Sequence, residues 1–214
     1  MTMPDQNTVE HNEGMASMPG TFVGIVGPSG AGKDTLIGLA RAALATEPKF
    51  IFPRRLVTRA STAWEDHDTL AQEEFDRLAN SGQFALHWQA NGLSYAIDRT
   101  ILHKIEAGSI AICNISRTSI ADARHAFTHL KIILITAPEA IIAARLAARG
   151  RDAPSDITQR LARNDYLALE GGADMTIIND TTPEEGSQKL IGYLHEAFKT
   201  SSAKVDRCTG LASL

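Results

Sequence analysis

The residues best suited to chemistry form one short stretch near the start of the chain. It reads Gly27, Pro28, Ser29, Gly30, Ala31, Gly32, Lys33, Asp34 and Thr35. Its glycines allow successive backbone N–H groups to surround a phosphate, and Lys33 adds a mobile positive charge. An apolar run precedes the stretch and an amphipathic helical pattern follows it, which is the context of a phosphate-binding loop. We therefore expect a nucleotide phosphate site here, against the alternative of a glycine-rich turn that only links a strand to a helix.

Asp34 departs from the usual pattern of such loops. A Ser or Thr normally stands at this place and binds Mg²⁺, and an Asp on another strand helps to hold the ion. In this chain the loop itself carries the carboxylate, and Asn114 follows the apolar run 110–113. We interpret Asp34 as the metal residue, in contact with Mg²⁺ directly or through a water, because Mg²⁺ accepts carboxylate oxygens. The alternative is that Asp34 only stabilises the first helical turn through the helix dipole.

The arginines that could hold phosphates fall into three groups. They are Arg54, Arg55 and Arg59; then Arg117; then Arg145, Arg149 and Arg151. Arg145 and Arg149 have i, i+4 spacing, so they share one helical face. Phosphoryl transfer needs charges that position and neutralise phosphates, and arginines at a helix end are typical of a cationic lid. The alternative is that these arginines are solvated surface charges.

An aromatic hairpin is the second candidate binding region. The dipeptide Asn91 and Gly92 separates two apolar runs, which is the strongest short-range hairpin signal. Gln89 and Tyr95 lie within these runs, and amides and hydroxyls beside aromatic rings suit a small polar substrate. Ordinary core aromatics in a hairpin are the alternative. His67 and His87 have no metal-ligand spacing, and we interpret both as structural.

Short apolar runs alternate with helical patterns along most of the chain. The expected strands are 21–26, a run starting near 49 and interrupted at Pro53, 84–90, 93–97, 110–113, 131–136 and 175–179. The expected helices are 35–44, 72–79, 117–127, one from Pro138 to about 149, 155–170, and one from Pro183 to about Lys199. This alternation predicts an α/β fold with a parallel sheet covered by helices on both faces.

The chain is expected to form one domain with an inserted lobe. The expected divisions are a disordered arm at 1–19, a single domain at 20–198 with a substrate lobe at about 60–97 and a lid at about 149–155, and a flexible tail at 199–214. Residues 61–68 are polar and typical of a loop.

Composition narrows the function classes. The formal net charge of −4 argues against a general binder of nucleic acid or of membrane surfaces. The two cysteines and the absence of a signal-peptide pattern or a long apolar segment indicate a cytoplasmic protein. We therefore expect a small-molecule substrate, with its charge held by local arginines. The sequence does not indicate an oligomeric state.

These motifs, in this order, resemble the guanylate kinase branch of the P-loop kinases. The similarity covers roughly residues 20–198 and looks most like the ribose 1,5-bisphosphate phosphokinase (PhnN) family. The residues that carry the resemblance to PhnN are the loop ending in Asp34, Glu65-Asp66-His67, the hairpin Trp88-x-Ala90-Asn91-Gly92-Leu93-x-Tyr95, and Asn114-Ile115-Ser116-Arg117. The resemblance implies a P-loop kinase fold that uses ATP and Mg²⁺, and the transfer of a phosphoryl group from ATP to ribose 1,5-bisphosphate in phosphonate breakdown.

The resemblance also implies roles for individual residues. Guanylate kinases read guanine with carboxylates, and at those positions we align Gln89, Asn114 and Ser116. Without charged acceptors for the purine amine, guanine specificity is not expected. The catalytic residues implied are Lys33, Arg145, Arg149 and Arg151, and the acceptor-binding residues are Arg54, Arg55, Arg59, Gln89, Tyr95, Asn114, Ser116 and Arg117. A nucleoside monophosphate kinase and a non-catalytic binding module are the alternatives.

Overall fold

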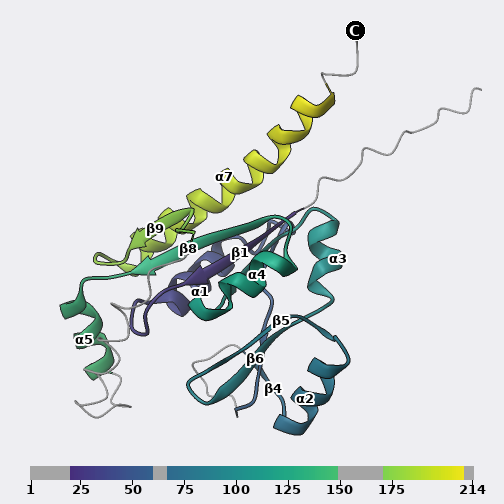
Figure 1. Cartoon of the computed structure of the whole chain (residues 1–214). Helices are drawn as coiled ribbons and strands as arrows, with labels where there is room; N and C mark the ends of the chain where they lie inside the picture. The colour runs from purple at the N-terminus through teal and green to yellow at the C-terminus, as the bar shows by residue number, and fades with distance from the viewer. Residues whose placement is uncertain (1–19, 60–66, 149–170, 210–214) are drawn as a thin grey trace, which may run out of the picture.

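The centre of the protein is a parallel sheet. The computed structural model describes residues 20–59, 67–148 and 171–209. The main sheet has five strands in the order β2-β7-β1-β8-β9. Figure 1 labels three of them, β1, β8 and β9. The five strands are β1 Thr21–Val26, β2 Phe50–Ile51, β7 Ile110–Asn114, β8 Leu130–Thr136 and β9 Met175–Ile178. All pairings are parallel, so the carboxyl ends of these strands lie along one edge of the sheet. The predicted α/β class is confirmed.

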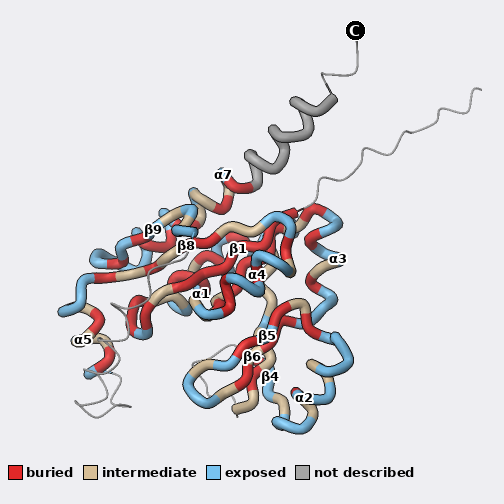
Figure 2. Tube along the Cα trace, in the orientation of Figure 1, coloured by how far each residue is buried: buried red, intermediate tan, exposed pale blue. Residues whose placement is uncertain are grey.

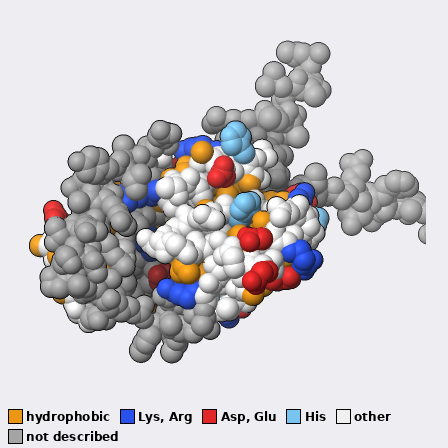
Figure 3. Space-filling model, turned by 60° about the horizontal axis from the view of Figure 1, so that its bottom comes forward, with side chains coloured by type: hydrophobic (Ala, Val, Ile, Leu, Met, Phe, Trp, Pro, Cys, Tyr) orange, Lys and Arg blue, Asp and Glu red, His pale blue; other side chains and the backbone are white. Residues whose placement is uncertain are grey.

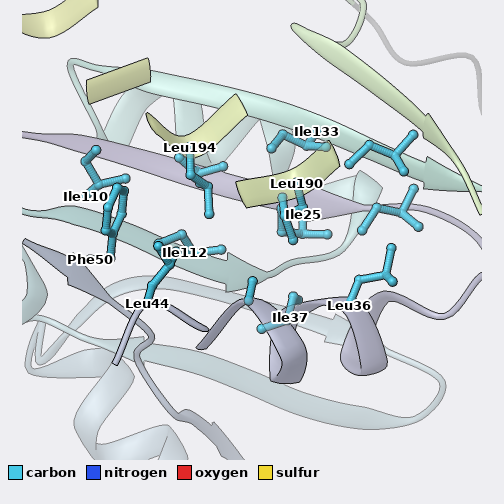
Figure 4. Close-up of a cluster of buried hydrophobic side chains, with 14 of the residues drawn as sticks. Ile25, Leu36, Ile37, Leu44, Phe50, Ile110, Ile112, Ile133, Leu190 and Leu194 are labelled. Carbon is cyan, nitrogen blue, oxygen red and sulfur yellow. The ribbon is translucent and has the colours of Figure 1, made fainter. Parts of the chain in front are cut away.

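Buried apolar side chains cover both faces of this sheet, because most positions in its strands are apolar. All six residues of β1 are buried (Figure 2). On one face, Ile25 packs with Leu36 of α1 (Lys33–Ala43) and Leu190 of α7 (Pro183–Thr209), as Figure 4 shows. This packing anchors α1, and therefore the loop before it, to the middle of the sheet.

The opposite face of the main sheet is covered by α3 (Ile101–Glu106) and α4 (Ile120–Ala126). The ring of Phe22 on β1 stacks on that of Phe127 with centroids 4.0 Å apart and planes inclined by 2°. Leu86 of the second sheet joins the same cluster. This face therefore connects the main body to the lobe described next.

The lobe is built on a second sheet, of four strands in the order β4-β3-β6-β5. Its strands are β3 Arg55–Val57, β4 His67–Thr69, β5 Phe84–Ala90 and β6 Leu93–Asp98, and α2 Gln72–Asn80 packs on it through Phe75. Asn91 and Gly92 both have positive φ, 51° and 73°, as a tight hairpin turn requires. The predicted hairpin is confirmed.

The remaining elements differ from the expected ones in several places. The helix α3 was not expected, His67 belongs to a strand rather than to a loop, and α7 continues to Thr209 instead of ending near Lys199. The predicted helix 117–127 divides into the short 3₁₀ helix η1 (Arg117–Ser119) and α4. The helix α5 (Glu139–Ala148) follows β8 as expected. Within the described ranges, no helix has the length and apolarity that crossing a bilayer requires.

Parts of the sequence prediction lie outside the described residues. They are the arm at 1–19, most of the loop at 61–68, the lid at 149–155 and the helix at 155–170.

Candidate active site

The phosphate-binding loop connects β1 to α1 at the carboxyl edge of the sheet. Gly27, Gly30 and Gly32 all have positive φ. A Cβ at Gly27 would stand 1.9 Å from the carbonyl oxygen of Ile135, so only glycine fits there. Gly32 is the N-cap of α1, which places the positive end of the helix dipole at the loop. Within the loop Ser29 is exposed and Pro28 and Ala31 are buried, and Thr35 in the first turn of α1 is exposed.

Lys33 lies across this loop. Its ammonium group donates hydrogen bonds to the carbonyl oxygens of Gly27 and Pro28, each at 2.8 Å. The ammonium group is therefore held against the first residues of the loop. A lysine in this place can follow the outer phosphates of a nucleotide as a point charge.

Asp34 is the meeting point of three elements. The side-chain amide of Asn114, at the end of β7, donates to its Oδ1 at 2.9 Å. Arg55, on β3 of the lobe, lies 4.0 Å from the same oxygen. The Asp34 side chain is 63% exposed, so these contacts leave the carboxylate open to solvent. The predicted metal residue and two predicted acceptor residues thus form one cluster.

Arg55 extends this cluster onto the hairpin. Its guanidinium lies over the Tyr95 ring, 5.8 Å from the centroid, within the range of a cation–π contact. The Tyr95 ring stacks in turn on Trp88, with centroids 5.5 Å apart and planes inclined by 6°. Arg55 has only 18% of its side chain exposed. This planar stack fixes the guanidinium beside the phosphate-binding loop.

Gln89 and Tyr95 lie on opposite faces of the lobe sheet. In the hairpin Trp88 pairs with Tyr95 and Gln89 with Ser94, so these two pairs point to opposite faces of the lobe sheet. Ser94 contacts Gln72 on α2, which shows that Gln89 lies on the α2 side. The two predicted substrate residues of the hairpin are therefore separated by the sheet.

The other predicted acceptor residues are placed differently from Arg55. Arg54 contacts β4, donating to the His67 carbonyl at 3.0 Å and pairing with Asp68 at 3.0 Å. Ser116 caps η1, where its hydroxyl accepts from the Thr118 N–H. Arg117 begins η1, and burial lowers the pKa of its guanidinium from the usual value.

Arg59 follows β3, and its carbonyl accepts a bond from Thr69 of the neighbouring strand. Arg59 thus lies on the lobe, at the start of the range 60–66 that the structure does not describe.

The residues present fit a magnesium ion in the usual way for a nucleotide site, where one or two carboxylates act together with phosphates and waters. Both protein contacts of Asp34 within the described ranges use Oδ1, so Oδ2 is open to a ligand. No group of three or more His, Cys, Asp or Glu side chains that could hold a metal occurs in the described part of the chain. A metal here would therefore depend on the nucleotide phosphates for most of its ligands.

Arg145 is the one member of the predicted lid group that the structure describes. Its helix α5 packs on the loop, since a Cβ at Gly30 would stand 3.2 Å from side-chain atoms of Ile142 and Leu146. One Arg145 nitrogen, Nη1, is buried and has no hydrogen-bond partner within the described residues. This nitrogen lies next to the loop, because a Cβ at Gly32 would stand 3.9 Å from it. Arg149 and Arg151 lie outside the described residues.

Asn179 is a site residue that sequence analysis missed. It follows β9, is only 2% exposed, and donates its side-chain amide to the Ala31 carbonyl of the loop at 2.8 Å. The signal that could have found it was a polar residue directly after a buried parallel strand, where ligand crevices of α/β sheets lie.

Charged side chains of both signs are mixed on one face of the molecule (Figure 3). On the face shown in Figure 3, the described Lys and Arg side chains are interspersed with Asp, Glu and His. Cys113, beneath Asn114, is not a candidate nucleophile, because burial raises the pKa of its thiol to about 12. The described residues around the loop therefore offer positive charges and hydrogen-bond donors and not a thiol nucleophile.

Comparison with known proteins identifies the family. No family model matches the chain. A ribose 1,5-bisphosphate phosphokinase PhnN from Methylobacterium radiotolerans is 45% identical over 179 residues, which cover 83% of this chain and 98% of that protein. Another PhnN, from Bradyrhizobium diazoefficiens, is 43% identical over 189 residues, or 88% and 95% of the two chains. The chain belongs to the PhnN family.

A solved structure shares the fold of this PhnN family member. The crystal structure of guanylate kinase from Anaplasma phagocytophilum has a TM-score of 0.65 and 20% identity, covering 85% of this chain and 88% of that one. The predicted resemblance to PhnN and the guanylate-kinase-like P-loop fold are both confirmed.

The three positions aligned with guanine-reading carboxylates have other roles in this PhnN family member. Asn114 is bonded to Asp34, Ser116 caps a helix and Gln89 lies on the α2 face. None of these three side chains carries a negative charge that could accept from a purine amine.

Proposed function

We propose that this protein transfers the γ-phosphoryl group of ATP to ribose 1,5-bisphosphate, giving ADP and 5-phospho-α-D-ribose 1-diphosphate. The observation that carries the proposal is the identity of 41–45% with three proteins of that name over most of both chains. The geometry supports it, because a phosphate-binding loop and an arginine fixed on an aromatic ring face each other across Asp34. We place the reaction in the cytoplasm and in phosphonate breakdown.

The reaction makes few demands on acid–base chemistry. An oxygen of the phosphate on C1 of the ribose attacks the γ-phosphorus of ATP, and the bond from that phosphorus to the bridging oxygen of ADP breaks. The attacking phosphate is already an anion at neutral pH, because the second pKa of a phosphate monoester is about 6. A general base is therefore not needed, and the protein's task is to align two anions and neutralise their charge.

Several of the described site residues have a place in that task. Lys33 and the N–H groups of the loop hold the ATP phosphates. Arg55, held by Tyr95, takes a phosphate of the acceptor, and Arg117 supplies a second positive charge after β7. Arg145 approaches the loop from α5, and we propose that Arg149 and Arg151 complete a lid that excludes water.

Mg²⁺ is the expected partner of ATP at this site. When bound, it neutralises charge on the β- and γ-phosphate oxygens. Asp34 would hold it through Oδ2, while Asn114 and Arg55 keep the carboxylate oriented through Oδ1.

The product distinguishes this function from others. The purified protein is incubated with ATP, Mg²⁺ and ribose 1,5-bisphosphate, and the products are followed by ³¹P NMR. We expect a pair of coupled diphosphate signals from the new sugar diphosphate as those of ADP appear. Release of ADP without a sugar diphosphate signal would contradict the proposal. Lys33→Ala is the control for contaminating kinases.

A further inference from the structure

Asn179 connects three parts of the fold behind the phosphate-binding loop. Its backbone N–H donates to the carbonyl of Thr136 at the end of β8, at 2.7 Å. Its side-chain amide donates to the carbonyl of Ala31 in the loop, at 2.8 Å. Its Oδ1 faces α7, where a Cβ at Gly186 would stand 3.2 Å away. The side chain thus occupies a buried position between the sheet edge, the loop and α7.

The amide orientation follows from the chemistry of the contact. Ala31 offers a carbonyl oxygen, which only accepts, so the NH₂ of Asn179 must face it. The other oxygen, Oδ1, is buried without a hydrogen-bond partner among the described residues. A buried unpaired acceptor is unfavourable, and a leucine of similar size would avoid it. The feature that the amide provides and a leucine lacks is the bond to Ala31.

That bond fixes the direction of the next N–H group. The peptide between Ala31 and Gly32 is trans and planar, so its N–H points opposite to its C=O. Because the Ala31 carbonyl points inward to Asn179, the Gly32 N–H points outward from the protein interior. This N–H has no acceptor among the described residues, and it lies at the N-cap of α1.

We propose that Asn179 is a positioning residue for nucleotide binding: it holds the Ala31–Gly32 peptide so that the Gly32 N–H is a ready donor to a phosphate of the nucleotide. The inference rests on the proposed function only in requiring a nucleotide, and it does not depend on the acceptor. The close packing of Gly32 against the Asn179 amide supports the proposal, since a Cβ at Gly32 would stand 2.3 Å from Nδ2 of Asn179. The loop and the amide are therefore in direct contact, and only glycine fits at position 32.

Two substitutions separate positioning from simple packing. Asn179→Asp keeps the size but places an acceptor against the Ala31 carbonyl, which favours a turned peptide whose Gly32 N–H bonds inward to the carboxylate. Asn179→Leu removes the bond without favouring that turn. We expect the dissociation constant for ADP, measured by calorimetry, to rise about tenfold in Asn179→Leu, the scale of one hydrogen bond to a charged group. It should rise further in Asn179→Asp.

If Asn179 served only packing, the ADP affinities of the two variants would be different. Loss of ADP affinity would then follow loss of thermal stability in both variants, and that result would overturn the proposal. Asn80→Asp, an exposed site at the end of α2, controls for the added negative charge and should bind ADP as the wild type does.

The wild-type protein provides a test that needs no variant to fold. In ¹⁵N–¹H spectra the Gly32 amide proton should move downfield on addition of ADP, because it gains a charged acceptor. A Gly32 amide proton that does not respond to saturating ADP would contradict the proposal. Failure of the ribose 1,5-bisphosphate assay would leave this result unaffected, so the two proposals fail separately.

Discussion

Asn114 at the end of β7 donates its side-chain amide to Asp34 in the phosphate-binding loop, across 2.9 Å. In the usual arrangement the loop supplies a hydroxyl and the strand a carboxylate. Here the carboxylate is on the loop and the amide is on the strand. A loop carboxylate has thus replaced the usual hydroxyl, and a strand amide in contact with it has replaced the usual carboxylate, which supports a metal role for Asp34.

These replacements lead to a prediction on metal dependence. Asp34→Asn keeps an acceptor for Asn114 but removes the charge. We expect the Mg²⁺ concentration for half-maximal activity to rise severalfold, because magnesium prefers carboxylate ligands. The measurement is a Mg²⁺ titration at saturating substrates.

The double variant Asp34→Ser with Asn114→Asp is the matched control, since it restores the usual hydroxyl and strand carboxylate. It should need less Mg²⁺ than Asp34→Asn. An unchanged Mg²⁺ dependence in Asp34→Asn, with a small loss of thermal stability, would instead favour the helix-dipole role.

Lys33→Ala tests whether this lysine acts in catalysis or in folding. Activity should be almost abolished, because the outer phosphates lose their point charge. The melting temperature should fall by no more than about 4–8 °C, since the two hydrogen bonds of Lys33 contribute about 1 kcal/mol each and 1 kcal/mol corresponds to about 2–4 °C at this chain length. Circular dichroism measures the second quantity. Lys189→Ala, an exposed lysine on α7, should alter neither, and an unfolded Lys33→Ala protein would remove the support for a catalytic role.

Arg55→Lys tests the stack on Tyr95. Lysine keeps the charge but loses the planar group that lies over the ring and binds phosphate with two donors. The KM for the sugar bisphosphate should rise about tenfold, as for one lost hydrogen bond to a charged group, and the KM for ATP should not change. Arg54→Lys, whose arginine contacts β4, should have the smaller effect. Equal effects of the two substitutions on the acceptor KM would contradict the assignment.

Arg149→Ala concerns the predicted lid, which lies outside the described residues. A charge engaged mainly in the closed, reacting state contributes to the transition state more than to binding. We therefore expect kcat to fall more than the affinity for ATP, as steady-state kinetics and equilibrium ATP binding would measure. A variant with unchanged kcat and weaker ATP binding would show that Arg149 serves nucleotide binding alone.

Much of this site could be predicted from local sequence patterns. The phosphate-binding loop follows from glycine spacing, and the hairpin from Asn91 and Gly92, because both depend on backbone geometry within a few residues. The central strands follow from uninterrupted apolar runs such as Thr21–Val26.

Contacts between distant segments could not be predicted in this way. Gln89 and Tyr95 are close in sequence, but the pairing register sends them to opposite faces. Asn179 reaches Ala31 only because β9 ends beside the loop, and Asp34 meets Arg55 only because the lobe folds back on the main sheet. Each of these contacts depends on tertiary packing and not on a local pattern.

The most direct test of the proposed function is a comparison of acceptors with ATP and Mg²⁺: ribose 1,5-bisphosphate, ribose 5-phosphate, AMP and GMP. The initial rate of ADP formation gives kcat/KM for each acceptor, and Lys33→Ala measures the background. We expect about 10⁴ M⁻¹s⁻¹ or more for ribose 1,5-bisphosphate, within the usual range for enzymes. For GMP we expect a value at least about a hundredfold lower, because two charged hydrogen bonds to guanine are missing. Phosphorylation of GMP at about 10⁴ M⁻¹s⁻¹ or more would contradict the proposed function.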